Sequence, residues 1–93
     1  MPSTERASFK AVLQKGNRIQ VPRLVRWKFK LESDHVLKVS VRRRNDLFDE
    51  TFYARMGKNG RITVPKLART LLLQGTREQS LASQFIEVRV EPA

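Results

Sequence analysis

Apolar and polar residues alternate in two stretches of the chain, residues 9–13 and residues 52–56. Each stretch has a phenylalanine, an alanine and a leucine or methionine at every second position. A period of two is typical of a β-strand with one face in a core. The alternation resumes at residues 19–21 and 62–64, where isoleucine and valine flank one polar residue. The pattern therefore predicts two pairs of short strands.

Residues that favour a tight turn separate the strands of each pair. Gly16 and Asn17 lie between the first two strands, and Asn59 and Gly60 lie between the second two. Glycine and asparagine adopt positive φ more readily than other residues and dominate short hairpin turns. We therefore expect each pair of strands to form a β-hairpin.

The two predicted hairpins belong to an internal repeat. A shift of 43 residues aligns residues 9–26 with residues 52–69, and nine of the 18 aligned pairs are identical. Chance would give roughly one identity. Repeat 1 covers about residues 8–46 and repeat 2 about residues 47–90. The chain length fits one domain, residues 1–93, built from two copies of one unit.

A proline follows each hairpin, Pro22 in the first copy and Pro65 in the second. Proline is accepted at the first position of a helix, where its missing N–H costs nothing, so a short helix is predicted after each. Spacing then predicts one apolar and one basic face for each helix. The apolar residues expected to pack are Leu24, Trp27 and Leu31 in the first helix and Leu67, Ala68, Leu71 and Leu72 in the second.

Aromatic residues are expected in the core. Trp27 lies on the predicted apolar helix face, so core packing is favoured over the alternative, stacking on a nucleic-acid base. The phenylalanines assigned to the core are Phe9, Phe29, Phe52 and Phe85.

Beyond the helices the two copies diverge. Alternation predicts further strands at residues 37–41 and 86–90, and a turn at residues 43–46 leads into repeat 2. Residues 74–84 contain about six residues more than the first copy has there, and they are expected to form a loop. Three acidic residues cluster in the turn region, Asp46, Asp49 and Glu50. We expect them to be exposed to solvent and not to form a catalytic carboxylate pair.

The composition excludes several classes of function. The chain has no cysteine and one histidine, His35, which excludes disulfide scaffolds, thiol catalysis and cysteine-bound zinc and leaves no histidine cluster for a metal. No apolar run approaches the roughly 18 residues of a membrane span. Residues 1–12 do not resemble a secretory signal. We therefore expect a cytoplasmic protein that is not an enzyme and needs no cofactor or metal.

The charge indicates the class of partner. Lysine and arginine number 19 and aspartate and glutamate nine, a net charge of +10. Residues 1–46 carry 12 basic and four acidic residues, net +8, whereas residues 47–93 carry seven and five, net +2. Such a surface attracts polyanions, nucleic acid first. The first half is expected to contribute more of the affinity.

The unit Lys-x-x-Arg-Ile-x-Val-Pro-x-x-x-Arg occurs at residues 15–26 and again at residues 58–69. With its preceding strand and following helix and strand, it resembles the AbrB-like (SpoVT/AbrB) swapped-hairpin domain, over residues 8 to about 42 and 51 to about 90. In that family two copies, usually from two chains, interleave their hairpins into one barrel that binds DNA. The resemblance implies that this chain is both copies fused.

The resemblance also implies that Arg18 and Arg61, at equivalent positions after the turns, face DNA. Guanidinium groups suit phosphates and guanine edges. Arg26 and Arg69 could instead brace the helices through a carboxylate, and residues 42–44 could form a solvated turn unless they lie on the same side as Arg18. The predicted DNA-binding residues are Lys15, Arg18, Arg23, Arg26, Arg42, Arg43, Arg44, Lys58, Arg61, Lys66 and Arg69.

The sequence thus predicts a mainly β fold, a pseudo-twofold AbrB-like β-barrel with two short helices. The predicted function is binding of double-stranded DNA, as a nucleoid-associated chromatin (architectural) protein or a transcriptional regulator. RNA is an alternative ligand because charge does not distinguish the two polyanions. The alternative from another class is a protein-interaction module, such as an antitoxin-like barrel that binds a partner. We expect no membrane contact and either a monomeric pseudo-dimer or a homodimer.

Overall fold

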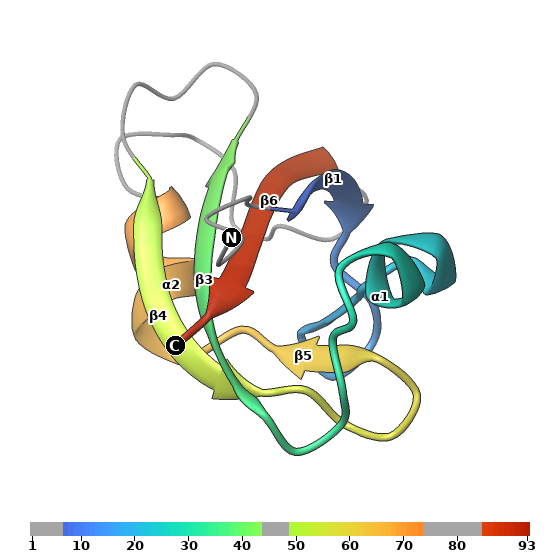
Figure 1. Cartoon of the computed structure of the whole chain (residues 1–93). Helices are drawn as coiled ribbons and strands as arrows, with labels where there is room; N and C mark the ends of the chain where they lie inside the picture. The colour runs from blue at the N-terminus through green and yellow to red at the C-terminus, as the bar shows by residue number, and fades with distance from the viewer. Residues whose placement is uncertain (1–6, 44–48, 74–84) are drawn as a thin grey trace.

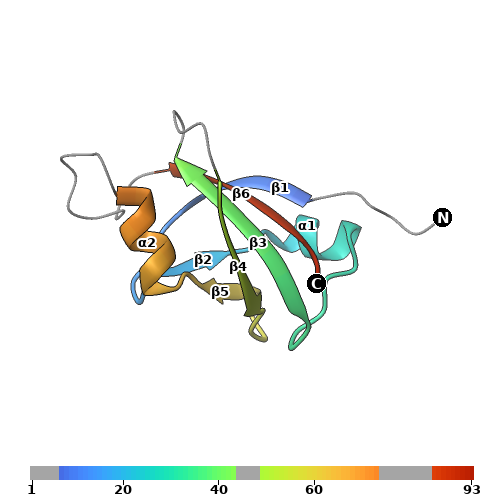
Figure 2. The same ribbon diagram turned by 90° about the vertical axis from the view of Figure 1, so that its left-hand side faces the viewer.

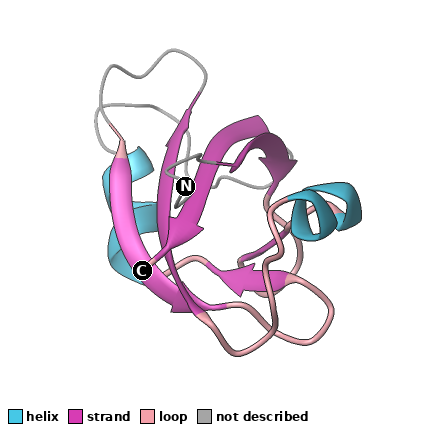
Figure 3. Ribbon diagram, viewed as in Figure 1, coloured by secondary structure: helices cyan, strands magenta, loops and turns pink. Residues whose placement is uncertain are grey.

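The computed structural model describes residues 7–43, 49–73 and 85–93, which form six strands and two short helices (Figures 1 and 3). This arrangement confirms the mainly β class that the alternating pattern predicts. The elements in chain order are β1 (Ala7–Val12), β2 (Arg18–Gln20), α1 (Arg23–Lys28), β3 (Val36–Arg43), β4 (Glu50–Arg55), β5 (Arg61–Thr63), α2 (Lys66–Leu73) and β6 (Phe85–Pro92).

The strands form two antiparallel sheets. Four strands form the main sheet, in the order β1-β6-β3-β4, and β2 pairs with β5 in a two-stranded sheet that we call the ribbon. Figure 2 shows the main sheet lying over the ribbon, with α1 and α2 at opposite ends of the molecule. Each sheet therefore has an inner face toward the other sheet and an outer face toward solvent.

The hairpin prediction is correct for the turns and wrong for the strand pairing. Between the first two strands there is one isolated bridge, from Gln14 to Arg18. Otherwise β1 pairs with β6, β4 pairs with β3, and β2 pairs with β5. Pairing β2 with β5 sets Ile19 opposite Ile62, and both side chains are fully buried. The alternating pattern fixes which side chains point inward but not which strand is the partner, so it does not specify this distant pairing.

The core lies between the inner faces of the two sheets. Alternate residues of the ribbon strands and of the residues just after them point inward, as the period of two predicts. Val39, Val41 and Val88 of the main sheet are also fully buried. The fully buried residues from the ribbon side are Ile19, Val21, Ile62 and Val64.

Both predicted helices are present, each directly after its proline. Pro22 has extended backbone (φ −57°, ψ 142°) and is the N-cap of α1. The first helical residue is therefore Arg23 and not the proline itself. The Arg26 N–H donates to the Pro22 carbonyl at 3.0 Å, and the Arg69 N–H donates to the Pro65 carbonyl at the same distance. Each helix thus starts at the point where its strand leaves the core.

The predicted buried face of α1 is wrong in part. Leu24 and Trp27 are 76% and 78% exposed, whereas Val25 and Phe29 pack against the core, as does Leu31. The reason is the register of the helix with the preceding strand. Val21 is buried just before the helix, and residues spaced by four lie on one helix face, so the buried face continues through positions 25 and 29.

The same rule explains α2. Val64 is buried before the helix, and Ala68 and Leu72 follow it at intervals of four and are buried. Leu67 and Leu71, which the spacing also assigned to the packed face, are exposed.

Among the phenylalanines, Phe85 is the exception. Phe52 is buried and Phe9 and Phe29 pack against the core, but Phe85 is 65% exposed. Phe85 is the first residue of β6, whose inward positions begin at Ile86, so its side chain points outward.

No helix in the described parts of the chain is long and apolar enough to cross a membrane. The predicted loop at residues 74–84 and the part of the turn at residues 44–46 lie outside the described residues.

Candidate nucleic-acid interface

The outer face of the ribbon carries four polar side chains and no acidic one. Because Ile19 and Ile62 point inward, the residues on either side of them point outward. Arg18 is paired with Thr63, and Gln20 is paired with Arg61. The two arginines are therefore diagonal neighbours, with Cβ atoms roughly 7–8 Å apart or somewhat less. Arg18 and Arg61 are both exposed. The structure thus brings together the two arginines that the sequence singles out.

The two predicted turns stand beside the ribbon, and each is closed by equivalent hydrogen bonds. The Gln14 N–H donates to the Arg18 carbonyl at 2.7 Å, and the Gly57 N–H donates to the Arg61 carbonyl at 2.9 Å. Lys15 and Lys58, one residue further on in each turn, are exposed. Both turns therefore place a lysine next to the ribbon arginine of the same copy.

Positive φ angles explain the composition of the turns. Gly16 (φ 81°) and Asn17 (φ 59°) are left-handed in the first turn, and Gly60 (φ 77°) is left-handed in the second. The guanidinium of Arg18 folds back over the first turn, where a Cβ atom at Gly16 would lie 3.2 Å from Arg18 Nε. The absence of a side chain at Gly16 thus gives the Arg18 guanidinium its place.

Backbone hydrogen bonds also tie each turn to the chain that follows the other ribbon strand. The Val21 N–H donates to the Gly60 carbonyl at 2.8 Å, and the Val64 N–H donates to the Asn17 carbonyl at 2.9 Å. Gln20 Nε2 adds a bond to the Asn59 carbonyl at 2.6 Å. These bonds hold the two turns in fixed positions relative to both strands.

Arg23 and Lys66, the first residues of the helices, are also exposed. They follow the ribbon strands after two intervening residues, of which the second is the proline. Their charges therefore extend the basic surface of the ribbon toward both ends of the molecule.

Arg26 and Arg69 contact the backbone, not the carboxylate that the alternative role of bracing the helices required. Arg26 lies against the second turn, since a Cβ atom at Gly60 would come within 2.6 Å of Arg26 Nε, and that nitrogen is buried without a hydrogen-bond partner. Arg69 Nε donates to the Val64 carbonyl at 3.2 Å. The bracing contacts seen at these two atoms thus involve the backbone, not a carboxylate.

Arg42 lies on the outer face of the main sheet, away from the ribbon. Its Nε and Nη2 atoms are each 2.8 Å from Glu87 Oε2, and its Nε is 3.9 Å from Asp49 Oδ1. Arg43 is half-buried at the end of β3. Arg44 lies outside the described residues. The structure therefore does not bring Arg42 together with Arg18.

The distribution of acidic residues separates the two outer faces. Residues 6–31 and residues 51–77 contain no aspartate or glutamate, and they include the ribbon, both turns and both helices. On the main sheet, Glu91 is 3.7 Å from Lys38, and Asp49 forms an ion pair with Arg89. Within the described residues, Lys38, Arg42 and Arg89 of the main sheet are thus paired with carboxylates, whereas Arg18 and Arg61 of the ribbon are not.

Gln20 and Thr63 are candidate site residues that the sequence reasoning missed. Both share the outer ribbon face with the arginines. The signal for them was the same period of two that identified the buried isoleucines, since the residue two positions after each arginine must point the same way.

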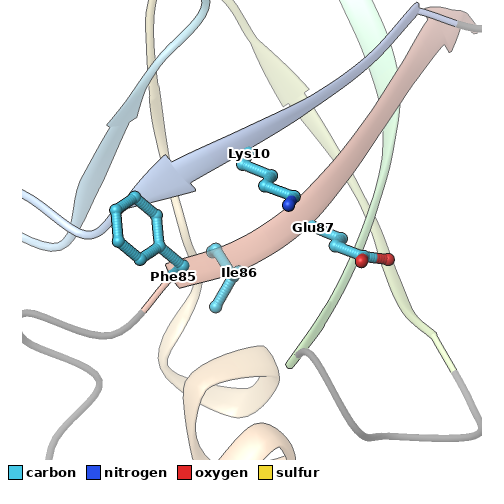
Figure 4. A pocket seen from close by; sticks show the side chains of 4 residues that line it. All are labelled: Lys10, Phe85, Ile86 and Glu87. Carbon is cyan, nitrogen blue, oxygen red and sulfur yellow. The ribbon is translucent and has the colours of Figure 1, made fainter.

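A small pocket lies elsewhere, at the start of β6. It has a volume of about 270 Å³ and is lined by Lys10 of β1 with Phe85, Ile86 and Glu87 (Figure 4). One ammonium and one carboxylate beside apolar groups do not form a nucleophile–base arrangement. Within residues 7–43, 49–73 and 85–93, no cluster of three or more histidine, cysteine, aspartate or glutamate side chains could hold a metal ion.

Comparison with known proteins bears on the fold. No family model matches the chain, and no curated protein matches it. Among solved structures, the chain is similar to the solution structure of PHS018 from Pyrococcus horikoshii, with a TM-score of 0.74 and 23% sequence identity. The match covers 92% of this chain and 89% of that one. The chain therefore shares its fold with the archaeal protein over nearly the full length of both.

Proposed function

We propose that the protein binds double-stranded DNA, with the outer face of the ribbon as the contact surface. The observation that carries this proposal is the pair of exposed arginines, Arg18 and Arg61, side by side on a ribbon with no acidic residue nearby in the sequence. Lys15 and Lys58 flank them. Uncompensated cations on one ribbon attract phosphates and release counterions, which is the main source of affinity for DNA.

The shape of the ribbon suits the major groove. A two-stranded β-ribbon fits into a major groove about 12 Å wide, and several DNA-binding proteins read bases with such a ribbon. Arginine forms two hydrogen bonds with guanine, glutamine does so with adenine, and threonine contacts the thymine methyl group. Arg18, Arg61 and Thr63 supply such groups, whereas Gln20 Nε2 already donates to the Asn59 carbonyl. The lysines and Arg23 and Lys66 would reach phosphates.

The architecture we propose is the pseudo-twofold swapped-hairpin barrel to which the sequence motif is similar. Three registers support it. Ala7 pairs with Val90 and Glu50 pairs with Val41, which are equivalent pairs under shifts of 43 and 49 residues. Ile19 and Ile62 face each other at the centre of the ribbon. The first strand of each copy thus pairs with the last strand of the other copy, as swapped hairpins require.

We favour the role of a non-catalytic, nucleoid-associated DNA-binding protein in the cytoplasm. The paired arginines give the surface an approximate twofold form, which suits either a pseudo-palindromic site or sequence-independent packaging. Gln20 and Thr63 occupy equivalent positions with different chemistry, so the two halves of the surface would not read identical bases.

Fluorescence anisotropy of a labelled random duplex across a salt series tests the proposal. The logarithm of the affinity should fall with the logarithm of salt concentration by about 0.9 for each neutralised phosphate. The Arg18→Ala/Arg61→Ala variant should bind the random duplex markedly more weakly, and its salt slope should be smaller by about 0.9 for each phosphate that it no longer neutralises. Both side chains are exposed, so the variant should remain folded.

The matched control removes the same charge from the main sheet. Lys10→Ala/Lys38→Ala also deletes two exposed or half-exposed cations, but from the outer face of β1 and β3. The affinity of this variant for the duplex should stay within about threefold of that of the parent protein, because only the net charge changes. Equal losses in the two double variants would place the contact surface elsewhere. Absence of duplex binding at low salt would exclude the ribbon as a surface for double-stranded DNA and favour the protein-interaction alternative.

A further inference from the structure

The surface of α1 exposes two large apolar side chains in a strongly basic setting. Leu24 and Trp27 lie one helical turn apart and are 76% and 78% exposed. A hollow of about 610 Å³ opens beside the indole. The residues that line it are Arg26, Trp27, Lys28, Lys30, Leu31 and Glu32. Exposed apolar groups of this size on a small domain point to a binding surface.

The end of α1 holds the cations around the indole. The Lys30 N–H donates to the Trp27 carbonyl at 3.3 Å and the Leu31 N–H donates to the Arg26 carbonyl at 2.9 Å, the two hydrogen bonds of a Schellman cap. Lys30 takes the left-handed position of this cap with φ 54°. Lys28 Nζ lies 5.6 Å from the centre of the Phe29 ring, a cation–π contact. The cap therefore orders the segment that carries the lysines.

We propose that this face of α1 binds single-stranded nucleic acid, with one unpaired base stacked on Trp27. Proteins that bind single strands combine an aromatic side chain, which stacks on a base, with cations that follow the phosphates. Trp27 supplies the ring, and Arg23, Lys28 and Lys30 supply exposed charges. One acidic residue, Glu32, also lines the hollow. Its Oε2 atom lies 3.6 Å from His35 Nε2.

Other occupants fit the surface less well. A membrane surface binds helices with a large apolar face, whereas α1 has six residues, a length of about 9 Å, and two exposed apolar side chains. A duplex keeps its bases stacked inside and offers no free ring to the indole. Protein surfaces that match a rim of three lysines and arginines would need dense acidic charge as well as an apolar group.

The proposed site is present once per chain. The position in α2 equivalent to Trp27 is Thr70, which cannot stack on a base. Leu67 is exposed at the position equivalent to Leu24, so α2 retains the apolar residue without the ring. This makes the stacking site independent of the ribbon, where both copies contribute an arginine.

The tryptophan itself reports on the site, because Trp27 is the one tryptophan of the chain. We would titrate the protein with oligodeoxythymidylate of about ten nucleotides, within the usual site size of about 4–16. Stacking should quench the Trp27 emission in a saturable manner, with one oligonucleotide per chain at saturation. A random duplex and vesicles of equal parts phosphatidylcholine and phosphatidylserine are titrated in parallel.

Variants separate stacking from charge. By anisotropy of the labelled oligonucleotide, Trp27→Ala should weaken binding about five- to 150-fold, and Trp27→Phe should retain part of the affinity. Tyr53→Ala is the matched control, since it removes another exposed aromatic residue, from β4. Lys28→Ala/Lys30→Ala should reduce the salt slope by about 0.7 for each phosphate that the variant no longer neutralises.

The outcomes are distinct from those for the ribbon. The proposal holds if Trp27→Ala weakens single-strand binding, duplex binding changes less than twofold, and Tyr53→Ala changes neither. It fails if the oligonucleotide does not quench Trp27, if the duplex quenches equally, or if only the vesicles shift the emission. Arg18→Ala/Arg61→Ala, which tests the ribbon, should leave quenching by the oligonucleotide in place.

Discussion

The outer faces of the two sheets both carry arginine, yet they differ in what surrounds it. On the main sheet, Arg42 lies 2.8 Å from Glu87, and Arg89 forms an ion pair with Asp49. On the ribbon, Arg18 and Arg61 lie in segments of the chain that contain no acidic residue. Across the described residues, the same side chain is thus part of an ion-pair network on one face and uncompensated on the other.

The difference shows where a net charge of +10 can act. Cations paired with carboxylates contribute little to the field beyond the pair, because the two charges cancel at a distance. The uncompensated cations of the ribbon, the turns and the helices produce the field that a polyanion meets. Location of acidic residues is therefore more informative about the binding face than the number of basic ones.

The sharpest test of the ribbon compares two neighbours on opposite faces. Ile62→Ala should lower the free energy of unfolding by about 2–5 kcal/mol, because Ile62 is fully buried and its removal leaves a cavity. Arg61→Ala should change stability by less than about 0.5 kcal/mol, since the side chain is exposed, but should weaken duplex binding. Urea unfolding and duplex anisotropy measure the two effects. If Arg61→Ala destabilised the protein as much, the outer face would serve folding rather than binding.

Replacing glycine by alanine should reduce the stability of the protein by different amounts in the two turns beside the ribbon. Gly60→Ala should cost about 2–3 kcal/mol, because φ is 77° and the new Cβ would lie 2.7 Å from Arg26 Cδ in a half-buried side chain. Gly16→Ala should lower the free energy of unfolding by about 1–2 kcal/mol, which is the cost of the left-handed backbone alone. The exposed Arg18 side chain can move away from the new methyl group.

Duplex binding should show the reverse order. Gly16→Ala displaces the Arg18 guanidinium, which contacts the turn at 3.2–3.3 Å, so it should weaken binding more than Gly60→Ala does among the folded molecules. Thermal unfolding and anisotropy well below the melting temperature separate the two effects. Equal binding losses would mean that the turns act only through stability.

Much of the fold follows from local patterns in the sequence. Alternation places Ile19 and Ile62 in the core, and the turn residues Gly16 and Gly60 have the predicted positive φ. Strand pairing does not follow from these patterns, because each strand has the same inward face whether it pairs with a local or a distant partner. The register between distant strands, such as β2 and β5, is therefore information that the local patterns do not contain.

Helix faces were predicted less well, for a physical reason. In α1 two apolar stripes compete, and the stripe with Trp27 carries more apolar area. The buried stripe is instead the one in register with Val21, the last core residue before the helix. A helix joined to a strand by a short link inherits its orientation from that strand, so the preceding buried residue predicts the face better than the size of the side chains.

The candidate site was predictable in its centre and not at its edge. Recurrence of Arg18 and Arg61 in the two copies identified a pair that the ribbon places on one face. The prediction that Arg42 shares this surface depended on which face of β3 it occupies, and the structure puts it on the outer face of the main sheet. Register between distant strands decides that placement, and a single sequence does not specify it.

The smallest effect belongs to the main sheet. Arg42→Ala should lower the free energy of unfolding by at most about 1 kcal/mol, because the Arg42 and Glu87 side chains are 41% and 36% exposed and water screens their attraction. Duplex affinity should stay within about twofold, since the charge removed was already paired. Raising the salt concentration should shrink the stability difference between Arg42→Ala and the parent. If Arg42→Ala instead weakened duplex binding as much as Arg61→Ala, DNA would contact the outer face of the main sheet, and the contrast between compensated and uncompensated arginines would not locate the interface.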